Sequence, residues 1–77
     1  MARIEKFERG ELNRLSLHDP IDAIYFEQEI DGRKLVQINT AGRTDRENPG
    51  KVSQSIQLDE RSGRQLWEIL SKHFGFR

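Results

Sequence analysis

The last third of the chain most strongly constrains the fold, because a strand, a helix cap and an amphipathic helix follow one another without a break. In residues 51–58, KVSQSIQL, apolar side chains alternate with polar ones, as in a strand with one buried face. Asp59 is a good N-cap, and apolar residues then recur at helical spacing as far as Phe74. We predict a strand over 51–58 and a helix over 60–74.

A hairpin is predicted upstream of this unit. Residues 23–30, AIYFEQEI, alternate between apolar and polar side chains, and residues 34–40 carry the returning apolar pattern. The Asp31-Gly32 dipeptide between the two segments is a strong turn signal.

The register of this hairpin depends on the loop length. A two-residue turn would place Phe26 opposite Gln37, so that an apolar side chain would share a face with a polar one. A loop longer by one residue pairs Phe26 with Ile38 instead. We therefore predict an odd-length loop or a bulge near Arg33, with Ile24, Phe26 and Ile30 in the core.

The N-terminal segment allows two interpretations. Its apolar residues would suit a helix, but Gly10 interrupts that pattern and Leu15 and Leu17 alternate as in a strand. We predict short strands over 3–9 and 12–17. Residues 41–50, AGRTDRENPG, have no apolar run and are predicted to form an exposed loop.

Seventy-seven residues form a single domain, 1–77, with a small core. The predicted class is α+β: a curved antiparallel sheet of four to five strands followed by one C-terminal amphipathic helix (ββββα). The chain has no cysteine, so neither a disulfide nor a thiolate metal site can reinforce it. Self-association is another common way to cover apolar surface, and we expect a homodimer.

The charge and hydropathy of the sequence limit which classes of partner the protein can bind. Thirteen basic and thirteen acidic side chains cancel, so any basic surface must be local. No segment approaches the roughly 20 apolar residues that cross a bilayer, and the charged N-terminus does not resemble a secretory signal. The expectation is a soluble cytoplasmic protein with no membrane partner.

Motifs for catalysis are absent from the sequence. It has no phosphate-binding glycine loop, no HExxH and no Gly-x-Ser-x-Gly elbow. His18 and His73 are the only histidines, and metal ligands usually cluster with further ligands. Glu27 and Glu29 alternate on a strand, which is typical of a solvated face. We expect no enzyme activity, no catalytic residues, no metal and no cofactor.

The polar side of the predicted sheet is the candidate binding surface. Amides and hydroxyls can bond phosphates and base edges, an aromatic ring can stack on a base, and cations at the rim attract the backbone. The wet side of any antiparallel sheet would also be polar, so the pattern alone leaves both interpretations open. The predicted nucleic-acid-binding residues are Tyr25, Arg33, Lys34, Asn39, Arg43, Lys51, Ser53, Ser55 and Gln57.

Two stretches carry a family resemblance. AIYFEQEIDGRKLVQI is similar to the hairpin, and NPGKVSQSIQLDERSGRQLWEIL to the loop, strand and helix, of the positive-cofactor-four family of transcriptional coactivators. The resemblance covers about residues 23–70, and the Pur-alpha and Whirly folds share the same strand and helix order.

The resemblance implies homodimers, formed largely through the helices and adjoining strands, that bind single-stranded DNA across a concave sheet. The basic turn of the family maps onto Arg33 and Lys34, and its Pro-Gly-basic loop onto Pro49, Gly50 and Lys51.

The predicted function is therefore binding of single-stranded DNA or RNA, in transcription or replication. The alternative is a small protein-interaction module, of the kind found as phage or plasmid accessory proteins or inhibitors, without nucleic-acid binding.

Overall fold

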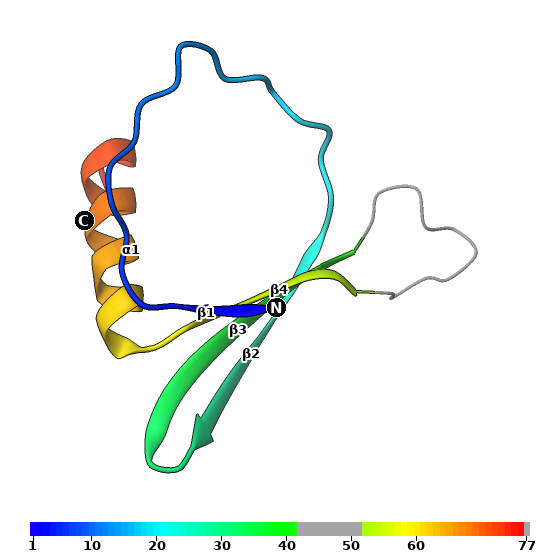
Figure 1. Ribbon diagram of the computed structural model, residues 1–77, viewed down its shortest axis with the longest axis vertical. Helices are drawn as coiled ribbons and strands as arrows, with labels where there is room; N and C mark the ends of the chain where they lie inside the picture. Colours follow the sequence, from blue (N-terminus) through cyan, green and yellow to red (C-terminus); the bar gives the residue numbers. More distant parts are fainter. Residues whose placement is uncertain (42–51, 77) are drawn as a thin grey trace.

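The protein forms an open α+β structure, with one helix beside a four-stranded sheet (Figure 1). The computed structural model describes residues 1–41 and 52–76. The predicted order of four strands followed by one C-terminal helix is confirmed. The elements are β1 (Ala2–Ile4), β2 (Ala23–Ile30), β3 (Arg33–Ala41), β4 (Val52–Leu58) and α1 (Glu60–Phe74).

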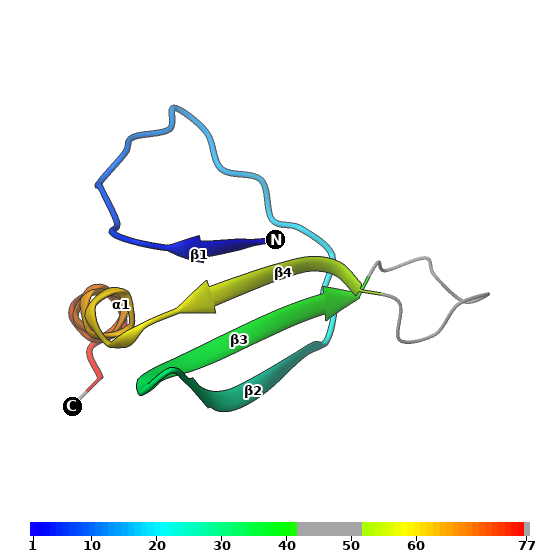
Figure 2. The same cartoon turned by 60° about the horizontal axis from the view of Figure 1, so that its bottom comes forward.

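The sheet is mixed, and its strand order is β1-β4-β3-β2 (Figure 2). β3 runs antiparallel to β2 and to β4, whereas β1 runs parallel to β4. The prediction of a wholly antiparallel sheet was therefore wrong. A parallel pair needs a long connection, and the chain provides one because residues 5–51, with β2 and β3 among them, separate β1 from β4.

The N-terminal strands differ from the prediction. Pairing ends at Ile4, and residues 12–17 contain no strand. Phe7 leaves the sheet to bond the side chain of Gln65 on α1, with 2.8 Å from its N–H to Oε1 and 2.8 Å from Nε2 to its carbonyl. Alternation in a short segment cannot by itself make a strand, because a strand also needs a neighbour with free backbone groups.

The hairpin has the two-residue turn that the sequence analysis rejected. Ile30 pairs with Arg33 and Phe26 pairs with Gln37, so the predicted odd loop or bulge near Arg33 was wrong. Asp31 and Gly32 have φ values of 53° and 75°. Positive φ at both central residues is the signature of a type I′ turn, whose twist suits a tight hairpin.

Helix α1 begins and ends where the sequence predicts. Asp59 accepts a hydrogen bond from the Ser62 N–H, and the Ser62 hydroxyl accepts one from the Asp59 N–H, which together form a capping box. Gly75 ends the helix in the left-handed conformation, with φ 76°.

The core of the single chain is very small. Among residues 1–41 and 52–76, Leu58 is the one buried hydrophobic residue, and every residue of β2 is exposed. The radius of gyration is 14.7 Å, compared with about 11.5 Å for a compact domain of this length. The predicted loop 41–50 lies outside the described residues except for Ala41, which ends β3.

Candidate nucleic-acid interface

One face of the sheet gathers most of its side-chain amides. Because directly paired residues point to the same side of a sheet, the register assigns every strand residue to a face. Phe26 pairs with Gln37, Gln37 with Gln57, and Asn39 with Ser55. We call this side the amide face; it comprises Arg3, Ile24, Phe26, Gln28, Ile30, Arg33, Leu35, Gln37, Asn39, Ser55 and Gln57.

Three of these amides form a hydrogen-bonded ladder across β3 and β4. Gln57 Nε2 donates to Gln37 Oε1 at 2.9 Å, and Gln37 Nε2 donates to Asn39 Oδ1 at 3.0 Å. The ladder fixes the orientation of the amides. It uses only part of their capacity, since each side-chain amide has two N–H donors and two acceptor lone pairs.

Two shallow hollows meet on this ladder. One, of about 230 Å³, is lined by Phe26, Leu35, Asn39 and neighbouring side chains of the same face. The other, of about 490 Å³, is lined by Arg3, Ser55 and the N-terminal residues. Both are also lined by Gln37 and Gln57, so the two hollows meet at the ladder.

The described strands place two arginines on the amide face, of which Arg3 is paired with Asp59. Arg3 lies on β1 at one edge of the sheet, and Arg33 begins β3 at the hairpin turn. Within the described strands no carboxylate shares this face, because Glu27 and Glu29 alternate to the other side. Phe26 is 42% exposed, so part of its ring is available for contact with a ligand.

The opposite face carries most of the apolar side chains of β1, β3 and β4. Val36 pairs with Leu58 and Ile38 with Ile56. On β2, however, this face carries polar and charged residues. We call it the apolar face; it comprises Ala2, Ile4, Ala23, Tyr25, Glu27, Glu29, Lys34, Val36, Ile38, Thr40, Gln54, Ile56 and Leu58.

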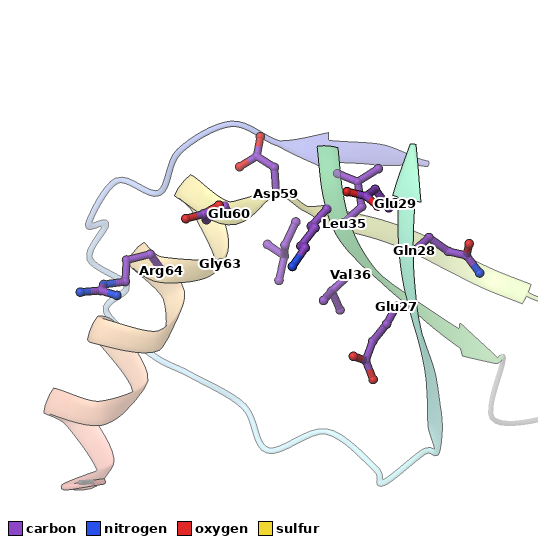
Figure 3. Close-up of a pocket in the computed structure, with 11 residues that line it drawn as sticks. Glu27, Gln28, Glu29, Leu35, Val36, Asp59, Glu60, Gly63 and Arg64 are labelled. Carbon is purple, nitrogen blue, oxygen red and sulfur yellow. The ribbon is translucent and has the colours of Figure 1, made fainter. Parts of the chain in front are cut away.

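Helix α1 begins beside the apolar face. A groove of about 920 Å³ runs between the β2–β3 hairpin and the first turns of the helix. Val36 lies between Glu27 on β2 and the helix in the close-up view (Figure 3). Glu29, Lys34 and Glu60 also line the groove.

The predicted site residues are divided by this register. Asn39, Ser55 and Gln57 share the amide face with Arg33, as predicted. Tyr25 pairs with Ile38, so its predicted place beside the amides was wrong.

Lys34 lies on the apolar face opposite Glu29, away from Arg33. Ser53 lies where the β3–β4 register shifts, between the pairs Thr40–Gln54 and Ala41–Val52. Arg43 and Lys51 lie outside the described residues.

Phe26 and Arg3 were missed by the sequence analysis. Phe26 was predicted to be core because it shares its side of the strand with Ile24 and Ile30. The Asp31-Gly32 dipeptide contained the missing signal, because its preference for a two-residue turn fixes Phe26 opposite Gln37. Arg3 had no comparable signal, since its position depends on a short parallel pairing with β4.

Arg3 also connects the amide face to the helix cap. Its Nη1 lies 2.8 Å from Asp59 Oδ2. The backbone N–H of Ser62 lowers the pKa of the Asp59 carboxyl below its ordinary value, and the Ser62 hydroxyl and Arg3 act in the same direction against partial desolvation. The cap carboxylate therefore stays ionised in moderately acidic solution.

Comparisons with known proteins assign no family. No family model matches the chain, and no curated protein or solved structure is significantly similar to it. In the described part of the chain, no helix has the length and apolar character needed to cross a membrane. Nor does any group of three or more His, Cys, Asp or Glu side chains there have an arrangement that could hold a metal ion.

Proposed function

We propose that the protein binds single-stranded nucleic acid on the amide face. The observation that carries this proposal is the placement of an exposed aromatic ring, a ladder of oriented amides and two arginines on one side of the sheet. Single-strand binding needs a stacking ring and cations for the phosphates, together with polar groups for sugars and base edges.

The corrected register strengthens this proposal. A face that contained Tyr25 would also have contained Glu27 and Glu29, whose charges would repel phosphates. The amide face instead has Phe26 as its aromatic ring. In this arrangement Phe26 would stack on a base, Arg33 would bind phosphate, and Gln37, Asn39 and Gln57 would bond the sugar or base edges.

The test is fluorescence anisotropy of a labelled mixed-sequence single strand, titrated at low and at physiological salt with a duplex as control. We expect micromolar or tighter binding that prefers the single strand and weakens as salt rises. Absence of binding at low salt would reject the proposal.

Two adjacent cations provide a matched pair of variants. Arg33→Ala removes a charge from the amide face, and Lys34→Ala removes one from the apolar face. Losing one phosphate contact should reduce the salt slope by about 0.7. We expect that reduction for Arg33→Ala and a markedly smaller one for Lys34→Ala.

We also propose that the protein acts as a homodimer, on the basis of its surface area. The single chain exposes 7668 Å², whereas a folded monomer of 9.0 kDa exposes about 4,850 Å². The excess of roughly 2,800 Å² is more than enough for a stable interface, which typically buries about 800 Å² per partner. A dimer formed through the apolar face would leave the amide face open.

A second candidate function is a module that binds a different protein, because that protein could cover the same apolar surface. Static light scattering separates the two. A mass of about twice 9.0 kDa for the purified protein supports the homodimer. A folded monomer without affinity for oligonucleotides would favour the protein-interaction module.

A further inference from the structure

We propose that residues 10–22 form a clasp that packs on helix α1 of a second copy of the chain. This inference rests on the proposed homodimer and adds to it which segment and which surface meet. We call residues 10–22 the arm.

The arm is anchored at both ends. It begins after Phe7, which Gln65 holds through two hydrogen bonds, and it ends at the start of β2. Figures 1 and 2 both show it running clear of the sheet and the helix. It contains neither helix nor strand.

The arm carries apolar side chains that have almost no contact within their own chain. Leu12, Leu15 and Leu17 are 73% to 101% exposed. Three largely exposed leucines in one short segment form an apolar surface that burial would stabilise. They therefore indicate a contact that the single chain does not provide.

A complementary surface lies on α1. Trp67, Leu70 and Phe74 form a stripe at helical spacing and are 36% to 63% exposed. At 100° per residue the centre of this stripe lies about 170° around the helix from Gln65. The arm of the same chain is fixed on the Gln65 side, so the stripe faces away from it.

A second copy of the chain would cover both exposed surfaces, the leucines of the arm and the stripe on α1. In a two-fold dimer the arm of each copy can cover the α1 stripe of the other, which satisfies the self-complementarity of an isologous interface. The dimensions agree, since Leu12 to Leu17 spans at most about 17 Å when extended and the stripe is about 10 Å long. The anchored ends make the arm a clasp around its partner and not an exchanged terminus.

Cross-linking between two different variants tests this contact. The chain has no cysteine, so Leu15→Cys in one preparation and Leu70→Cys in another each introduce a single thiol. After mixing and mild oxidation, mass spectrometry should find a mixed disulfide between the two variants. Arg14→Cys replaces Leu15→Cys as the control, and its mixed product should form on the order of ten times more slowly, because the proposed contact is made by the leucines and not by Arg14.

A second set of variants measures the energetic role of the leucines. The triple change Leu12→Ser, Leu15→Ser and Leu17→Ser should weaken dimerisation at least roughly 100-fold in sedimentation experiments, because it removes the buried apolar groups. Changing the neighbouring polar residues Glu11, Asn13 and Arg14 to Ser should leave the dimer unchanged.

The outcomes distinguish this inference from the proposed function. A dimer that gives no preferred mixed disulfide would reject the clasp and leave the dimer and nucleic-acid binding intact. A monomer in light scattering would reject both the clasp and the homodimer. If the triple variant fails to fold, the cross-linking experiment still decides the contact.

Discussion

The two faces of the sheet are built by the same strands but differ in chemistry. On β3, Gln37 and Asn39 contribute to the amide ladder, while Val36 and Ile38 point to the apolar face. The amide face fixes its own polar groups by mutual hydrogen bonds, whereas Ile4, Ile38 and Ile56 on the apolar face are only half-buried in the single chain. This difference supports the proposal that one face binds a polar ligand and the other packs against an apolar partner.

The largest expected effect comes from placing the same charge on each face. Ile38 and Asn39 are consecutive, are both half-buried and point to opposite sides. Ile38→Asp should destabilise the proposed homodimer by more than about 3 kcal/mol, because it would put a carboxylate into the proposed apolar interface. Urea denaturation at fixed protein concentration measures this change.

Asn39→Asp is the matched control. It should change the free energy of unfolding by less than about 1 kcal/mol, because its side chain lies on the polar face. It should nevertheless weaken oligonucleotide binding by placing a negative charge there. Equal destabilisation by the two variants would contradict the assignment of the faces.

A smaller effect on stability is expected from a substitution in the Asp31-Gly32 turn, which sets the face on which each residue of β2 lies. Gly32 has φ 75°, where a side chain is strained. Gly32→Ala should cost about 1–2 kcal/mol. Gly10→Ala, at a position without a positive φ and with open space for a Cβ, should cost less than about 0.5 kcal/mol in the same thermal or chemical denaturation. A Gly32→Ala variant as stable as the Gly10→Ala control would argue against the type I′ turn.

The helix cap should have a smaller effect still. Asp59→Ala removes the acceptor for the Ser62 N–H and should lower Tm by roughly 5 °C. Asp59→Asn retains a good cap but loses the ion pair with Arg3, so it should retain most of the thermal stability. Calorimetry of the two variants thus separates the contribution of the cap to thermal stability from that of the ion pair. If Asn were as damaging as Ala, the charge and not the cap would hold the helix start.

The pH dependence of stability should also report on the Asp59 carboxylate. The pKa of Asp59 is lowered in the folded protein, so its stabilising contribution is complete above the unfolded value of about 3.9. This contribution is lost as the pH falls through the folded pKa. The stability difference between the unsubstituted protein and Asp59→Asn should therefore shrink below about pH 4. A difference that persists unchanged at pH 2 would contradict this origin.

The sequence predicted the elements whose signals are local. The α1 bounds and the Asp59 N-cap were confirmed, because a cap residue and the helical spacing act within a few residues. The face assignment of β4 was also confirmed, with Ser55 and Gln57 opposite to Ile56 and Leu58.

The pairing of β2 with β3, and so the face on which each β2 residue lies, was predicted wrongly because two sequence signals conflicted. Apolar alternation placed Phe26 with Ile38, while the Asp31-Gly32 turn placed it with Gln37. The turn prevailed because β2 is exposed on both sides in the single chain, so burial does not select a face. The N-terminal strands could not be predicted because their pairing depends on distant partners, on β4 and on Gln65.

The measurement that tests the account most directly compares Phe26→Ala with Tyr25→Ala in single-strand binding. The two aromatic residues are adjacent in sequence, but Phe26 lies on the amide face and Tyr25 on the apolar face. Phe26→Ala should weaken binding by roughly 10-fold through lost base stacking, and Tyr25→Ala should leave the affinity nearly unchanged. The reverse order, with Tyr25→Ala the weaker binder of two folded variants, would contradict the amide face as the binding surface.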